Sequence, residues 1–125
     1  MPRKKQKSPS ELLRESIVEA MLDKKAKDPV VIDFTKMNTV VCDFFIICHG
    51  TSRPHVEAIA DAIITDVKKK TGQNPWHKEG FENAEWILID YGDIVVHIFQ
   101  DIRRNFYNLE QLWADAEIIR INTKE

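Results

Sequence analysis

Two aspartates and a histidine lie close together in the segment WILIDYGDIVVHIF, residues 86–99. Asp90 and Asp93 lie on either side of Tyr91 and Gly92, and His97 follows four residues after Asp93. Carboxylates and an imidazole can bind a metal ion or transfer protons. Catalytic metal-binding carboxylates commonly sit at positions i and i+2 of one strand, whereas this pair straddles a turn, where aspartate is a common turn former. We therefore expect a turn rather than a catalytic site.

Two further clusters carry weak signals for chemistry. Cys48, His49 and His55 lie near one another, but neighbouring strand residues point to opposite faces and no CxxC or HxxxH spacing accompanies them. Gly50-Thr51-Ser52 precedes a predicted helix, whose N-terminus could receive a phosphate, yet the segment matches neither glycine-rich phosphate motif. We interpret Gly50 as a turn residue, with Ser52 or Thr51 as the helix cap. No metal and no cofactor is expected.

The aspartates are positioned by a predicted β-hairpin with strands at 86–90 and 94–99. A two-residue turn at Tyr91 and Gly92 places Asp90 opposite Asp93, and Trp86 opposite His97. Alternation assigns one purely apolar face to the core: Ile87, Ile89, Ile94, Val96 and Ile98. The other face is mixed: Trp86, Leu88, Asp90, Asp93, Val95 and His97. If a helix covers this face, the acids lie at its edge; if it is open, it resembles an interface with an aromatic anchor and an acidic rim.

The other elements are predicted from periodicity and end signals. Helices are expected over 9–25, with Ser8 as cap, between Ser52 and Gly72, and over 102–113. Strands are expected at 30–34, 43–48 and 116–121, and a loop at 73–84. The order predicts an α+β (α/β) fold, a mixed sheet with flanking helices in a single domain.

The charge of the chain is unevenly placed. Of 125 residues, 43% are apolar and 30% charged, with a net charge of −2. Four of the 18 basic residues (Arg3, Lys4, Lys5 and Lys7) lie in the first seven, so 14 basic and 20 acidic side chains remain, a net −6. An acidic body favours basic partners over bare nucleic acid. We expect a basic tail at 1–8, either solvated or in contact with RNA phosphates, and a domain at 9–122.

Cysteine content and hydropathy indicate the compartment. Cys42 and Cys48 are the only cysteines, and they are predicted to be buried thiols in a reducing environment. No apolar stretch reaches the length of a membrane span, and no apolar segment follows the basic N-terminus as in a secretory signal. The chain is expected to be cytoplasmic, without a membrane partner.

Several segments together resemble the Iojap family, also called ribosomal silencing factor RsfS. The resemblance runs from about residue 10 to residue 117 and is carried by the following segments: CDFFIICHGTS, VEAIADAI, HKEG, WILIDYGDIVVHIF and RNFYNLEQLWADA. No single segment is decisive, but their order and spacing are specific.

The resemblance implies a fold related to nucleotidyltransferases, usually as a homodimer, and a non-enzymatic role. Family members bind the large ribosomal subunit through ribosomal protein L-fourteen, block joining of the small subunit and repress translation when nutrients are scarce; organellar relatives act in ribosome assembly. The alternative is a nucleotidyltransferase-like enzyme. Such enzymes carry an Asp-x-Asp pair soon after a Gly-Ser turn, whereas Asp90 lies some 40 residues after Gly50.

The ribosome-facing surface implied by the resemblance lies around the hairpin. The predicted partner-binding residues are Glu79, Gly80, Trp86, Asp90, Tyr91, Asp93 and His97. Trp86 is expected at the centre of the interface, although a core position would equally suit a tryptophan at this place in the pattern.

Overall fold

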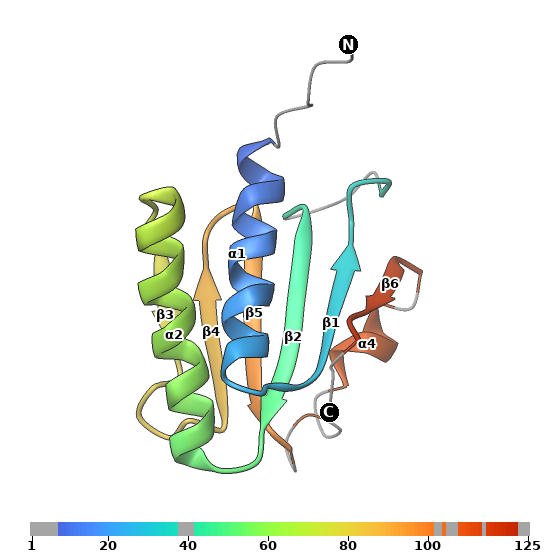
Figure 1. Cartoon of the computed structure of the whole chain (residues 1–125). Helices are drawn as coiled ribbons and strands as arrows, with labels where there is room; N and C mark the ends of the chain where they lie inside the picture. Colours follow the sequence, from blue (N-terminus) through green and yellow to red (C-terminus); the bar gives the residue numbers. More distant parts are fainter. Residues whose placement is uncertain (1–7, 38–41, 102–103, 105–107, 114, 123–125) are drawn as a thin grey trace.

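The computed structural model describes residues 8–37, 42–101, 104, 108–113 and 115–122 (Figure 1). Its centre is a six-stranded mixed sheet with the order β3-β4-β5-β2-β1-β6. The strands are β1 (Lys27–Asp33), β2 (Phe44–Gly50), β3 (His77–Glu79), β4 (Trp86–Asp90), β5 (Ile94–Gln100) and β6 (Glu117–Arg120). β2 and β5 run parallel, and every other neighbouring pair is antiparallel. The predicted α+β class with a mixed sheet is confirmed.

Two long helices cover one face of the sheet (Figure 1). The helices are α1 (Pro9–Asp23), α2 (Arg53–Thr71) and the short α4 (Leu109–Leu112). Ser8 and Ser52 cap α1 and α2, since each side-chain oxygen accepts a backbone N–H three residues later, at 3.1 and 3.2 Å. α2 ends at Gly72, which adopts a left-handed conformation with φ 78°. The predicted caps Ser8 and Ser52 and the predicted end of α2 are confirmed, whereas α1 ends at Asp23 rather than at residue 25.

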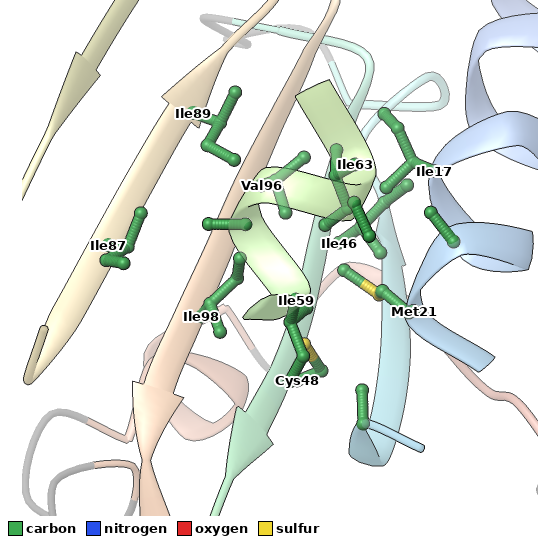
Figure 2. Packing of buried hydrophobic residues seen from close by; sticks show 14 of the residues in the cluster. Ile17, Met21, Ile46, Cys48, Ile59, Ile63, Ile87, Ile89, Val96 and Ile98 are labelled. Carbon is green, nitrogen blue, oxygen red and sulfur yellow. The ribbon is translucent and has the colours of Figure 1, made fainter. Parts of the chain in front are cut away.

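The core between helices and sheet is aliphatic. Ile17 and Met21 of α1 and Ile59 and Ile63 of α2 are fully buried against the strands (Figure 2). The predicted apolar face of the hairpin lies in this core: Ile87, Ile89, Ile94, Val96 and Ile98. Both cysteines are buried free thiols. Burial of these side chains is the main stabilising contribution to the fold.

The opposite face of the sheet carries a second, aromatic cluster. Phe34 lies edge-on to Phe45 and to Trp113, which follows α4, with ring centroids 4.9 and 5.0 Å apart. Phe99 of β5 is buried in the same cluster, and Trp86 packs against it. The predicted helix over 102–113 is described only in part, because residues 102–103 and 105–107 lie outside the described residues.

The loop predicted at 73–84 contains a strand, so this prediction is wrong for His77–Glu79. All three residues of β3 are exposed, and they pair with β4 at the edge of the sheet. A strand with no buried side chain leaves no hydrophobic alternation in the sequence, and only pairing with β4 reveals it. Among the described residues, no helix has the length and apolar character that crossing a membrane requires.

We expect Gly80, which ends β3, to be essential to the fold. Its φ is +89°, and an added Cβ would collide with the backbone carbonyl oxygen of Trp86. Gly80→Ala should therefore lower the free energy of unfolding by roughly 3 kcal/mol, combining left-handed strain with overpacking. Gly72→Ala is the matched control, because Gly72 has φ +78° but nothing within 4 Å of an added Cβ; it should cost only about 1 kcal/mol. Urea unfolding measures both, and equal losses would contradict the collision.

Candidate partner-binding surface

The hairpin turn differs from the prediction by its register. Asp90 pairs with Val95, Leu88 with His97 and Trp86 with Phe99. The Tyr91 N–H donates to the Ile94 carbonyl at 2.9 Å, so Gly92 and Asp93 form the turn rather than Tyr91 and Gly92. Gly92 has φ +91°, a conformation that favours glycine. A shift of two pairing positions keeps every side chain on its predicted face, so the two faces are correct although the opposing pairs are wrong.

Three aspartates meet at this turn. The Asp93 carbonyl accepts the N–H groups of Asp43 and Phe44, at 2.8 and 3.1 Å, which joins the turn to the start of β2. The Asp90 carboxylate accepts the Gly92 N–H at 2.7 Å as a turn-forming contact. Burial, with the negative charges of Asp43, Asp90 and Asp93, raises the pKa of the Cys42 thiol to about 11. We call Asp43, Asp90 and Asp93 the acidic turn.

Trp76 lies against the acidic turn and is the most exposed large apolar side chain of the described residues, at 81%. The backbone N–H of Trp76 donates to the Asp90 carbonyl at 2.7 Å, and its indole lies against Gly92, where a Cβ would come within 3.0 Å of the ring. Tryptophan is enriched at the centres of protein interfaces, where its large side chain serves as an anchor. Sequence reasoning missed Trp76, because it lies in a polar loop without periodicity; its size in such a loop was the available signal.

Glu79 and Gly80 extend this surface along β3. The Glu79 carboxylate accepts from His77 Nε2 at 2.7 Å, and both side chains are exposed. His77 pairs with Asp90 across the strands, so this hydrogen-bonded pair borders the acidic turn. Gly80 is exposed, and its backbone conformation ends the strand. Of the predicted residues, Glu79, Gly80 and Asp93 are therefore exposed, and Asp90 is half-buried.

The remaining predicted residues lie deeper. Tyr91 is 3% exposed and packs in the aliphatic core beneath the helices, where burial raises its pKa to about 12. His97 is 4% exposed. Trp86 is half-buried and stacks on Phe99 with ring centroids 5.1 Å apart. Asp90, Asp93, Glu79 and Gly80 line the edge and one end of the sheet, whereas Tyr91 and His97 are buried on its two opposite faces.

His97 and Trp86 form a hydrogen-bonded pair. The Trp86 indole N–H donates to His97 Nδ1 at 3.0 Å, so the neutral ring carries its hydrogen on Nε2. Nε2 is buried and has no hydrogen-bond partner among the described residues. Burial lowers the pKa of His97 to about 4, because a charged ring would lose its hydration. A buried neutral imidazole suits a structural role rather than proton transfer near neutral pH.

The surface offers little for metal chemistry. Within the described part of the chain, no three His, Cys, Asp or Glu side chains are grouped to hold a metal ion. The Asp90 carboxylate is engaged by the turn, and Asp93 contributes its backbone carbonyl rather than its side chain to the junction with β2. An exposed aromatic side chain beside three carboxylates is better suited to contact a basic protein.

Comparison with known proteins shows the family of this chain. The family model described as "Ribosomal silencing factor during starvation" matches residues 5–125. The chain belongs to the RsfS family. The ribosomal silencing factor of Bacillus subtilis is 44% identical over 96 residues, 77% of this chain and 80% of that protein. That of Halalkalibacterium halodurans is 43% identical over 104 residues, 83% and 87% of the two chains.

A solved structure supports the fold. A crystal structure from Chromobacterium violaceum superposes with a TM-score of 0.76 at 33% identity, covering 82% of this chain and 83% of that one. The family resemblance expected from the sequence is thereby confirmed.

We expect the buried His97 to make stability depend on pH. In the unfolded chain the ring has an ordinary pKa near 6.5, and in the folded chain about 4. The unfolded state therefore takes up a proton first, so stability is lost as pH falls from about 6.5 to about 4, by up to about 3 kcal/mol. Urea unfolding between these pH values measures the slope.

His97→Leu should reduce the slope of unfolding free energy against pH by the equivalent of up to one proton. This holds whatever the effect of the substitution on stability at pH 7. His77→Gln is the control, because it removes an exposed histidine of the same sheet and leaves His97 in place. The same slope in wild type and His97→Leu would show that His97 does not titrate as its burial requires.

Proposed function

We propose that this protein is a cytoplasmic ribosomal silencing factor that acts without catalysis. It binds the large ribosomal subunit through ribosomal protein L-fourteen, blocks joining of the small subunit and represses translation under nutrient limitation. The observation that supports this surface most directly is Trp76, 81% exposed and resting on the glycine of the acidic turn. Self-association of the protein as a homodimer stays a prediction.

The surface has the two parts that recognition of a basic protein needs. The Trp76 indole supplies a large apolar anchor that loses its hydration on binding. Asp93 is exposed, and Asp43 and Asp90 lie half-buried beside it, which matches an anchor with an acidic rim. Cations on ribosomal proteins would be attracted to this rim, so the acidic turn should speed association and orient the domain.

Blocking follows from the size of the domain. A layer of helices on a layer of sheet is roughly 20 Å thick, given a helix diameter of about 10 Å and similar interlayer spacing. A rigid body of this thickness on the joining face of the large subunit would keep the small subunit from docking. Repression then requires only tight occupancy of the surface, with no chemical step.

The decisive experiment is sedimentation of the protein with isolated ribosomal subunits and with joined ribosomes. We expect the protein to sediment with large subunits and to be absent from joined ribosomes. Added before the small subunit, it should reduce the joining of the two subunits. Sedimentation with small subunits instead, or equally with joined ribosomes, would overturn the proposal.

Trp76→Ala should weaken binding to the large subunit by about thirtyfold, the effect of losing about 2 kcal/mol at an interface centre. The thermal midpoint should change little, because the side chain is mostly exposed. Leu112→Ala is the matched control, since Leu112 of α4 is also a large apolar side chain with 70% exposure. If Leu112→Ala weakens binding as much as Trp76→Ala does, the anchor is misplaced.

Asp93→Lys should slow association with the large subunit several-fold at low salt, and the difference should shrink as salt rises from about 50 to 300 mM. The fold should persist, because Asp93 holds β2 through its backbone carbonyl. Asp61→Lys provides the same change of charge at an exposed position of α2 and should have a smaller effect. Equal slowing by both variants would indicate a response to net charge alone.

A further inference from the structure

A pair of lysines lies at the same end of the molecule as the acidic turn. Figure 1 shows that α2 ends, β4 ends and β5 begins at one end of the sheet, and α1 starts there too. Lys68, Lys69 and Lys70 form the last turn of α2, and the chain reaches Trp76 six residues after Lys70. Opposite charges are therefore carried by neighbouring elements at one end of the domain.

The three lysines differ in their partners. Lys70 donates to the Glu19 carboxylate of α1 at 2.6 Å, and Asp66 also lies within its electrostatic reach. Lys68 reaches only the Gly72 carbonyl, at 3.3 Å. Both Lys68 and Lys69 are exposed, and neither forms an ion pair with a described carboxylate. These two lysines are exposed cations for which the described contacts show no ion pair.

Stabilisation of the helix end does not require both of them. The C-terminus of a helix carries roughly half a negative charge, which a single cation offsets, at a gain of about 0.3–1 kcal/mol. The left-handed Gly72 already closes the helix by donating its N–H to the Lys68 carbonyl at 2.9 Å. One of the two exposed lysines, Lys68 and Lys69, therefore has no structural function that the described contacts show.

We propose that Lys68 and Lys69 contact phosphates of the large-subunit RNA that borders the bound ribosomal protein. This inference rests on the proposed function. A ribosomal protein is surrounded by RNA, whose phosphates repel the acidic turn and attract lysines. Because the domain carries both signs of charge at one end, it is oriented on the large subunit. The acidic turn and Trp76 then face the basic protein, and the end of α2 faces the RNA.

The test compares Lys68→Gln/Lys69→Gln with wild type on two targets, isolated large subunits and purified ribosomal protein L-fourteen. Two lost phosphate contacts should reduce the slope of log affinity against log salt by about 1.4–1.8, roughly a twentyfold loss at about 150 mM salt. Affinity for the isolated ribosomal protein should stay unchanged. Thermal melts check that both exposed positions tolerate glutamine.

Lys24→Gln/Lys25→Gln is the matched control, because Lys24 and Lys25 are an exposed pair that follows α1. α1 ends at the opposite end of the molecule (Figure 1). The control should keep the wild-type slope. An unchanged slope in Lys68→Gln/Lys69→Gln, or an equal loss in the control, would overturn the RNA contact.

The RNA contact would also be overturned if Lys68→Gln/Lys69→Gln weakened binding to the isolated ribosomal protein as much as binding to large subunits. The lysines would then contact the protein partner. If wild type binds no large subunits, the proposed function fails together with this inference. If wild type binds but the lysine variant behaves like it, only this inference fails.

Discussion

The parallel pairing of β2 with β5 is the constraint on which the rest of the structure depends. The two strands pair continuously from Phe44 with Ile94 to Gly50 with Gln100. Parallel neighbours cannot be joined by a tight turn, so the chain must cross over between them, and here α2, β3 and β4 form the crossover. Central strands are also buried on both faces, which explains the nearly unbroken apolar runs in β2 and β5.

The same pairing assembles the candidate surface. Because β2 and β5 run in one direction, their first residues lie together, and the Asp93 carbonyl can accept two N–H groups from the start of β2. β4 runs antiparallel to β5, so its last residue, Asp90, arrives at this end as well. The turn that carries Asp90 and Asp93 is thus joined to Asp43 by backbone hydrogen bonds. These bonds do not depend on the side chains of Asp43 and Asp93, whereas the Asp90 carboxylate takes part in the turn itself.

The two faces of the sheet support this surface differently. Beneath the helices, mostly aliphatic side chains give a dense core, in which the hydroxyl of Tyr91 is a buried polar group. On the other face, aromatic rings surround His97. Its ring centroid lies 4.5 Å from that of Phe45, and its Nδ1 accepts the indole N–H of Trp86. An imidazole in such a layer orients the indole through a directional bond, which apolar packing cannot do. Trp86 is consequently held half-buried in this layer, whereas Trp76 is exposed and is the anchor that we propose.

Local signals in the sequence were enough to predict most elements of the fold. Ser8, Ser52 and Gly72 mark helix ends through hydrogen bonds within a few residues, and alternation separates the two faces of the hairpin without knowledge of its exact register. The family resemblance was likewise readable from ordered motifs. Three features required the tertiary structure: the turn at Gly92 and Asp93, the strand β3, and the exposure of Trp76. Each depends on contacts with residues distant in sequence or on which side chains remain uncovered after packing, and neither leaves a periodic pattern in the chain. Residue types thus determined which faces are apolar, whereas pairing of the strands decided which polar and aromatic residues meet at the surface.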